Sequence, residues 1–241
     1  MTQLAIDLSP AVILRQAGRA AAPDPVHLAV AAELGGADAV ALHVRENRDL
    51  ITDRDVRMLR RTLTVPLFLR TACTPEMTGL ALELKPALVT LVTEKPQSLA
   101  VGAVDIVVYR DAVAEAVATL QSSGLPVCVA VAPDIEHVKI AHRIGAAAVE
   151  IDTGDFARAT AGLRERLAAT IADSVSYAAK LKVAVHASGG LDYQGLKRLA
   201  GLRNIDWFRL GRSVVARALM TGMKTAVADF QQLLRCPPAA P

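Results

Sequence analysis

The sequence predicts an α/β protein, specifically a (β/α)8 TIM barrel with extra helices. Short apolar runs alternate with helical patterns along the 241 residues, which is typical of repeated βαβ units. Hydrophobic residues make up 52% of the chain and aromatic residues only 3%, so the core consists of small aliphatic side chains, as in helices packed on a parallel sheet. Polar and glycine-rich segments follow the apolar runs, where barrels of this class carry their sites.

Nine apolar runs have the length and composition of buried strands. They are Leu4–Leu8, Ala39–Val44, Pro66–Thr71, Ala87–Val92, Val104–Tyr109, Val127–Val131, Ala147–Ile151, Val183–His186 and Ile205–Leu210. A closed barrel needs eight strands. We therefore expect either the Val104–Tyr109 strand or the one before it to lie outside the ring. An open doubly wound sheet is the alternative, but no G-x-G-x-x-G motif follows the first strand.

Helical patterns separate most of these runs, and their ends carry recognisable signals. The predicted helices are Pro25–Leu34, Asp53–Leu63, Pro75–Leu84, Asp111–Ser122, Asp134–Ile144, Phe156–Leu181, Tyr193–Leu202 and Met220–Leu234. Thr52 and Asp55 have the spacing of a capping box, and Thr74-Pro75 places an N-cap before a proline at the first helical position. We expect one domain over residues 1–236 and a disordered tail over 237–241.

Composition excludes several classes of function. A net charge of +3 is too small to indicate nucleic-acid binding. No apolar window reaches the length of a membrane span, and the N-terminus has no signal-peptide pattern. Three widely spaced cysteines fit a reduced cytoplasmic protein and form no zinc motif, so we expect no metal. We also expect no cofactor. Cys73 precedes a helix N-terminus, a position that lowers the pKa of a thiol, but we expect this residue to be a small apolar packing residue.

The polar segment after the second predicted strand is the first candidate site. His43 suits proton transfer near neutral pH, and the alternative is a histidine packed at a strand end with a backbone partner. Arg45 and Arg48 suit bidentate binding of phosphate or carboxylate, and the alternative is ion pairing with neighbouring acids. Asp7, at the end of the first strand, could orient a ligand amine or pair with Arg15.

The second candidate site is a phosphate cradle at the last two strands. Ser188-Gly189-Gly190-Leu191 follows one of them, and Leu210-Gly211-Arg212-Ser213 follows the other. Backbone N–H groups of such loops, together with the start of a short helix, bind phosphate in many barrels. The expected partner is therefore a small anionic, phosphorylated substrate.

Several motifs resemble the pyridoxine 5'-phosphate synthase family of vitamin B6 biosynthesis. The most specific is H-x-R-E-x-R-x-x-I-T-D-R-D-V, which begins at His43. Further matches are Leu14-Arg15, Pro23-Asp24-Pro25, Gly36-Ala37-Asp38, Glu94-Lys95, Asp152-Thr153-Gly154 and the run from Arg217 to Lys224. The resemblance implies a (β/α)8 barrel that forms a homo-oligomer, generally an octamer. It also implies condensation of an aminoacetone-type phosphate with 1-deoxy-D-xylulose 5-phosphate.

The resemblance is weaker at the family's catalytic positions. The family's catalytic glutamate falls at Arg70, its second catalytic histidine at Gly189, and a histidine of the last strand at Arg212. Only His43 remains of the three catalytic groups, and His186, three positions before Gly189, is a candidate replacement. Arginines cannot act as general bases at neutral pH, so we expect a strongly cationic site that contains Arg45, Arg48, Arg70 and Arg212.

Three functions remain open. The first is a diverged enzyme that uses His43 as base on a phosphorylated or carboxylated keto substrate, with arginines stabilising an enolate or oxyanion. The second is a genuine pyridoxine 5'-phosphate synthase with rearranged catalytic groups. The third is a non-catalytic protein that binds a phosphorylated metabolite. The persistence of His43 together with the phosphate-type loops favours the first.

Overall fold

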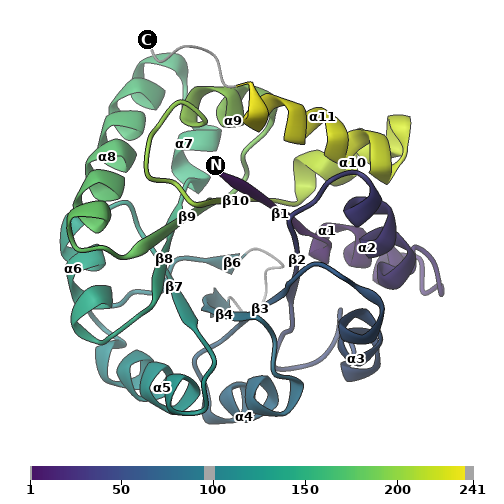
Figure 1. The fold of residues 1–241 in the computed structure, drawn as a ribbon, viewed down its shortest axis with the longest axis horizontal. Coiled ribbons are helices and arrows are strands. Elements are labelled where there is room, and N and C mark those ends of the chain that lie inside the picture. The colour runs from purple at the N-terminus through teal and green to yellow at the C-terminus, as the bar shows by residue number, and fades with distance from the viewer. Residues whose placement is uncertain (1, 95–100, 237–241) are drawn as a thin grey trace.

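A computed structural model of the chain describes residues 2–94 and 101–236 and contains a closed parallel barrel (Figure 1). The predicted (β/α)8 architecture is confirmed. The ring follows the order β1-β10-β9-β8-β7-β4-β3-β2. Its strands are β1 (Gln3–Asp7), β2 (Ala39–His43), β3 (Leu67–Thr71), β4 (Leu88–Leu91), β7 (Val127–Val131), β8 (Ala148–Asp152), β9 (Ala184–Ser188) and β10 (Trp207–Leu210).

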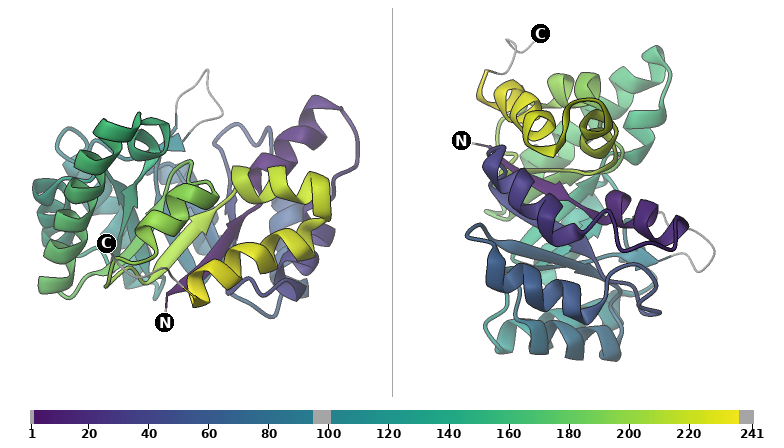
Figure 2. Two further views of the ribbon diagram at one scale, coloured as in Figure 1. Left: turned by 90° about the horizontal axis from the view of Figure 1, so that it is seen from above. Right: turned by 90° about the vertical axis from the view of Figure 1, so that its right-hand side faces the viewer.

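Helices surround the ring of strands on its outside, as two further views also show (Figure 2). They are α1 (Ser9–Ala17), α2 (Pro25–Leu34), α3 (Asp53–Thr62), α4 (Pro75–Leu84), α5 (Arg110–Ser122), α6 (Ile135–Arg143), α7 (Gly154–Arg158), α8 (Ala161–Lys180), α9 (Tyr193–Leu199), α10 (Arg212–Thr221) and α11 (Met223–Arg235). None of these helices is long and apolar enough to cross a membrane.

Of the nine predicted strands, the fifth, Val104–Tyr109, is wrong: it lies outside the ring, as expected for one of two candidates, but it is not a strand. This segment forms turns, and the Asp105 side chain accepts a hydrogen bond from the backbone N–H of Val108 at 3.1 Å. Its last three side chains are exposed rather than alternating between two faces, so it has no core-facing row to pair with a sheet. The minor strands lie just before it instead, as the antiparallel pair β5 (Thr93–Glu94) and β6 (Val101–Gly102).

Two long predicted helices are each interrupted. The predicted 156–181 helix divides at Ala159 and Thr160, which have extended backbone. The predicted 220–234 helix begins only at Met223, because Gly222 adopts φ +79° and separates α10 from α11. Helix α1 had not been predicted. The predicted tail 237–241 lies outside the described residues.

Side chains on each strand point alternately into and out of the barrel, and the inward-facing ones form layers inside it. The lower layers contain mostly small or apolar side chains, namely Ala5, Ala39, Ala41, Phe68, Leu88, Cys128, Ala148 and Trp207. The next inward-facing positions of several strands carry charges instead: Asp7, His43, Arg70, Glu150 and Arg209. Because these positions are nearest the carboxyl ends of the strands, the polar layer forms the floor of the barrel mouth.

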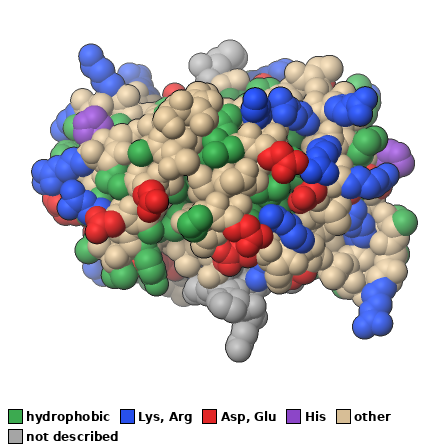
Figure 3. All heavy atoms as spheres, turned by 90° about the horizontal axis from the view of Figure 1, so that it is seen from below, with side chains coloured by type: hydrophobic (Ala, Val, Ile, Leu, Met, Phe, Trp, Pro, Cys, Tyr) green, Lys and Arg blue, Asp and Glu red, His purple; other side chains and the backbone are tan. Residues whose placement is uncertain are grey.

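The two ends of the chain pack against each other. Helix α11 contacts α2 and β1, and Gly35, which follows α2, lies so close to α11 that a Cβ would be 2.5 Å from the carbonyl oxygen of Lys224. Gln231 donates to the carbonyl of Gly36 at 2.8 Å and to Asp38 at 3.0 Å. On the outer face drawn in Figure 3, acidic and basic side chains are interspersed, in keeping with the small net charge.

Candidate active site

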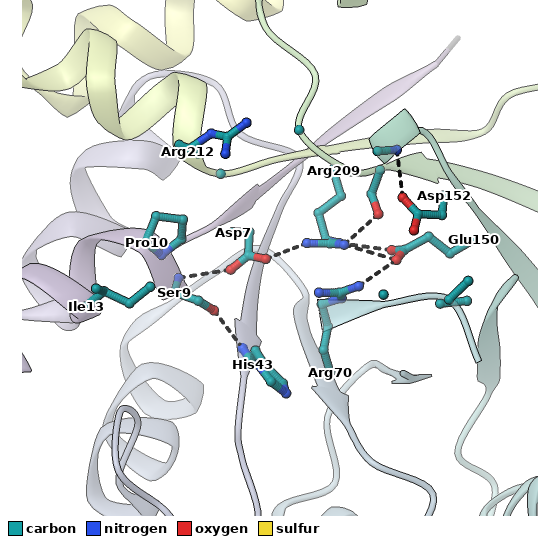
Figure 4. Close-up of a pocket in the computed structure, with 18 of the residues that line it drawn as sticks. Asp7, Ser9, Pro10, Ile13, His43, Arg70, Glu150, Asp152, Arg209 and Arg212 are labelled. Atoms are coloured by element: carbon teal, nitrogen blue, oxygen red, sulfur yellow. Dashed lines mark hydrogen bonds and ion pairs between the residues drawn. The ribbon is translucent and has the colours of Figure 1, made fainter. Parts of the chain in front are cut away.

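A pocket of about 530 Å³ opens at the carboxyl ends of the barrel strands (Figure 4). Its lining comes from almost every part of the ring and includes Asp7, Ser9, His43, Arg70, Glu150, Asp152, Ser188, Gly189, Gly190, Arg209, Gly211 and Arg212. Both predicted sites therefore contribute to one cavity. Polar groups cover its floor, and glycines form part of one wall.

A buried network of ion pairs forms the floor of the pocket. Glu150 on β8 accepts hydrogen bonds from Arg209 at 2.9 and 3.0 Å and from Arg70 at 2.8 Å. Arg209 also donates to Asp7 and, at 2.6 Å, to the hydroxyl of Ser188. Asp7 in turn accepts a hydrogen bond from the backbone N–H of Ser9 at 2.9 Å. Strands β1, β3, β8, β9 and β10 are thus linked across the barrel by side chains.

The two carboxylates in this network are ionised. Burial raises the pKa of Glu150, but Arg209 and Arg70 outweigh that effect and hold the pKa far below its usual range. The same two arginines outweigh burial at Asp7, whose pKa is also lowered. Two negative and two positive charges therefore balance on the floor of the pocket. The expectation of a strongly cationic site is wrong here, because Glu150 and Asp7 neutralise the arginines.

His43 forms a pair with Glu94 at the edge of the pocket. Its Nε2 lies 3.0 Å from Oε1 of Glu94, and both side chains are largely buried. The backbone N–H of His43 donates to Ser9 Oγ at 2.9 Å, which fixes the strand end against α1. When Nε2 donates a hydrogen bond to the Glu94 carboxylate, Nδ1 is the ring nitrogen whose lone pair can accept a proton. The arrangement suits a histidine that takes and returns one proton.

The segment after β2 is held in place by its own ion pairs. Thr52 and Asp55 form the predicted capping box, with hydrogen bonds of 3.1 and 3.2 Å. Arg15 pairs with Asp55 at 2.8 Å and not with Asp7, so the proposed Asp7–Arg15 pair is wrong. Arg45 lies 3.8 Å from Glu94.

Arg48 belongs to the outer part of that segment. Its guanidinium lies 3.7 Å from Asp53 and 3.5 Å from Glu76. Neither Arg15, Arg45 nor Arg48 is among the residues that line the pocket. The structure thus gives all three of these arginines ion-pairing partners within the protein.

The glycine-rich wall lies where the phosphate cradle was predicted. Gly189 adopts φ +119°, and a Cβ there would be 2.3 Å from Oδ1 of Asp152 and 2.8 Å from the N–H nitrogen of Gly154. Gly190 also has a positive φ, and a Cβ on it would approach Arg212 at 3.4 Å. Position 189 therefore requires glycine for both backbone conformation and space. No catalytic side chain fits at this point of β9.

His186 lies below the pocket rather than in its lining. It is buried inside the barrel between the rings of Phe68 and Trp207, with centroids 6.1 and 6.0 Å away. Burial lowers its pKa to about 4, so the ring is neutral near pH 7. The structure does not bring His186 to the substrate, because residues two apart on a strand occupy successive layers and Ser188 holds the upper one.

Two groups of the site escaped the prediction. Glu150 is the single charged residue in the predicted apolar strand Ala147–Ile151. Because a buried charge requires a partner, its position in that strand could have indicated a buried ion pair. Glu94 follows the fourth predicted strand and belongs to the Glu94-Lys95 motif, but no role was predicted for it, and its neighbour Lys95 lies outside the described residues. Cys73 is half-buried, packs against the core and has a pKa raised by burial, in keeping with a packing role. Among the described residues, no cluster of three or more acidic, histidine or cysteine side chains could hold a metal ion.

The fold and the site define a (β/α)8 barrel with a polar pocket at the carboxyl ends of its strands, the arrangement typical of barrel enzymes. The sequence profile of the pyridoxal phosphate biosynthesis protein PdxJ matches residues 4–236, and the chain belongs to this family. Its members are enzymes that catalyse a condensation.

Individual relatives are similar along almost their whole length. The pyridoxine 5'-phosphate synthase of Desulfatibacillum aliphaticivorans is 40% identical over 98% of this chain and 99% of its own. That of Syntrophobacter fumaroxidans is 42% identical over 97% and 99%. Solved structures share the fold alone. A 4-hydroxy-2-oxoglutarate aldolase from TTHB1 has a TM-score of 0.62 at 19% identity, covering 96% of this chain and 94% of its own. A phosphoribosylanthranilate isomerase from Thermotoga maritima has 0.60 at 14%, covering 97% and 100%.

Proposed function

We propose that this protein catalyses the reaction after which its relatives are named, the synthesis of pyridoxine 5'-phosphate. The observation that carries the proposal is similarity of about 40% along the whole chain together with a His43–Glu94 pair at the mouth pocket. The substrates would be those of the family, an aminoacetone-type phosphate and 1-deoxy-D-xylulose 5-phosphate. Of the three functions considered in the sequence analysis, we therefore propose the second, a genuine pyridoxine 5'-phosphate synthase.

The glycine-rich wall suits the phosphate end of a substrate. Gly189 and Gly190 have positive φ angles, which glycine adopts without strain. Because glycine has no side chain, a ligand can approach the backbone N–H groups closely at both positions. Arg212 lines the same wall, is exposed, and begins helix α10, whose first N–H groups lack helical partners. A phosphate there would be bound by a cation and by backbone donors.

His43 supplies proton transfer at the other side of the pocket. With Nε2 donating to Glu94, Nδ1 can accept a proton from a carbon next to a ketone and later return it. Glu94 stabilises the imidazolium that forms between these two steps, because its carboxylate faces the charged ring at hydrogen-bond distance.

The direct test is turnover of purified protein with both substrates, followed by the appearance of pyridoxine 5'-phosphate and released phosphate. His43→Asn should lower kcat by about 10²–10⁴-fold, the usual worth of a positioned acid–base group. His27→Asn is the matched control, because His27 is exposed on α2 and away from the pocket. Absence of product with folded protein, and failure to restore growth of a strain that requires vitamin B6, would overturn the proposal.

A diverged reaction on a single keto phosphate is the second candidate. It is favoured by Arg70 and Gly189, which place no acid–base group at two positions where the family resemblance predicts them. Exchange of a substrate α-proton with deuterated water, without pyridoxine 5'-phosphate, would support it. Ligand-dependent thermal stabilisation with neither exchange nor product would instead indicate a protein that only binds a phosphorylated metabolite.

A further inference from the structure

Arg70 differs from Arg209, the other arginine of the pocket floor, in the number of its hydrogen bonds. Its guanidinium is 4% exposed and lines the pocket, yet its only hydrogen bond among the described residues is the one from Nη2 to Glu150. Nε is buried without a partner. A guanidinium carries five N–H donors, so most of the donors of Arg70 are unused.

Arg209 is the opposite case. It makes four hydrogen bonds, to Asp7, to both oxygens of Glu150 and to Ser188. These bonds leave few donors for a ligand. Arg212 is exposed and lies on the glycine-rich wall, where the phosphate is proposed to bind. Among these three arginines, Arg70 is therefore the buried cation with hydrogen-bonding capacity left.

Arg70 is also a direct neighbour of the proposed base. His43 and Arg70 are paired in the register of β2 and β3, and both side chains point into the barrel (Figure 4). The charge of Arg70 is also deeply buried. Burial and repulsion by Arg209 lower the pKa of Arg70, against the opposing effect of Glu150 and Asp7. A negative oxygen beside Arg70 would accept hydrogen bonds from its unused N–H groups and would offset part of the cost of burying its charge.

We propose that Arg70 is a catalytic residue that binds the substrate oxygen on which negative charge develops when His43 removes a proton. His43 Nδ1 takes the proton from the carbon next to a ketone, and the electron pair of that C–H bond forms a C=C bond. The carbonyl π electrons move to the oxygen, which becomes an enolate oxygen bound by Arg70. This role rests on the proposed function, and it identifies the substrate class as a phosphorylated ketone with an exchangeable α-proton.

A pair of phosphate probes tests this role without turnover. 2-Phosphoglycolate carries a planar carboxylate that mimics an enolate, and 2-hydroxyethyl phosphate carries a neutral hydroxyl at the same place. Calorimetry on the wild type should show 2-phosphoglycolate binding about 10- to 100-fold more tightly, the worth of a hydrogen bond between charged groups. Arg70→Gln should abolish that preference and leave the affinity for 2-hydroxyethyl phosphate unchanged.

Two further variants keep the test decisive. Arg212→Gln should weaken both probes equally, because it removes a contact to the shared phosphate. Arg70→Lys retains the charge beside Glu150 and should keep part of the preference, which provides a folded variant if Arg70→Gln does not fold. In turnover, Arg70→Gln should lower kcat by about 10²–10³-fold, as removal of an oxyanion donor does in other enzymes.

The outcomes separate the two proposals. Equal affinity of the wild type for both probes, or a preference that survives Arg70→Gln, overturns the role of Arg70 and leaves the proposed function intact. Failure of both probes and of inorganic phosphate to bind overturns the phosphate site, and with it the proposed function and this role. A retained probe preference in a protein that forms no pyridoxine 5'-phosphate supports Arg70 and contradicts the proposed function alone.

Discussion

Arg70 and Arg209 donate to the same oxygen atom, Oε1 of Glu150, at 2.8 and 3.0 Å. The two arginines come from strands β3 and β10, which are not neighbours in the ring. One carboxylate therefore holds two cations that would otherwise repel each other within the barrel. Glu150 is thus the carboxylate that links the two arginines of the pocket floor.

Removal of this carboxylate's charge should destabilise the protein. Glu150→Gln leaves two buried guanidiniums without their shared partner, and breaking a buried ion pair in this way costs about 3–5 kcal/mol. Urea unfolding followed by circular dichroism measures the change. Glu83→Gln is the matched control, because Glu83 and its partner Arg57 are both exposed and such pairs contribute at most about 1 kcal/mol. Equal effects of the two changes would contradict the importance of the network.

Gly189 should tolerate no side chain. Gly189→Ala would force a Cβ to within 2.3 Å of Asp152 at a backbone φ of +119°, so we expect a loss of about 2–4 kcal/mol or a displaced loop that no longer binds phosphate. Gly79→Ala provides the control. Nothing lies within 4 Å of a Cβ at this helical position, and alanine there should stabilise α4 by about 1 kcal/mol. Thermal melting with and without inorganic phosphate distinguishes the two variants.

His186 should make stability depend on pH in a defined direction. Burial lowers its pKa from 6.5 to about 4, so at pH 5 the unfolded chain binds a proton at this residue that the folded protein does not. Stability is therefore lost as the pH falls from 6.5 towards 4, by about 2 kcal/mol at pH 5. His186→Gln lacks this titration. If the variant and the wild type lose equal stability between pH 8 and pH 5, His186 does not have the lowered pKa.

Asp55 should stabilise the segment that carries His43. It accepts hydrogen bonds from Thr52 and from Arg15, and its side chain is 3% exposed. Asp55→Asn should cost about 1–3 kcal/mol, because it weakens the helix cap and the charged hydrogen bond together. Asp53→Asn, two residues earlier in the same helical turn, removes a partly exposed charge that lies 3.7 Å from Arg48 and should cost less than about 1 kcal/mol. Chemical denaturation of both variants provides the comparison.

The sequence was sufficient for the barrel because local patterns determine its parts. Apolar runs identified each of the eight ring strands, and the Thr52–Asp55 spacing identified the start of α3. The one false strand, Val104–Tyr109, is apolar in composition, and only the three-dimensional structure shows that its outer half faces solvent. Helix α1 was not predicted, although Pro10 in its first turn and Arg15 in its last turn are helix signals, because its nine residues are too few for the apolar spacing to identify a helix.

Local sequence patterns predicted less of the candidate active site than of the barrel. The glycine-rich wall and His43 could be placed, since each follows the end of a strand. The partners of Arg70 and Asp7 could not, because both lie on strands that are distant in the sequence. Which carboxylate meets which guanidinium is set by the register of several strands at once. Because the prediction did not include Glu150 as a partner, it described the arginines as a strongly cationic site.

The contact between Asp7 and Arg209 joins residues 202 positions apart. During synthesis Asp7 leaves the ribosome long before Arg209 is made, and β1 has only β2 beside it until β10 is complete. The nascent chain thus exposes the N-terminal edge of an open sheet for most of its synthesis, and the pocket floor forms only at the end. A stalled or truncated chain that lacks β10 and α11 would have an unpaired Asp7, an open sheet edge and an incomplete candidate active site.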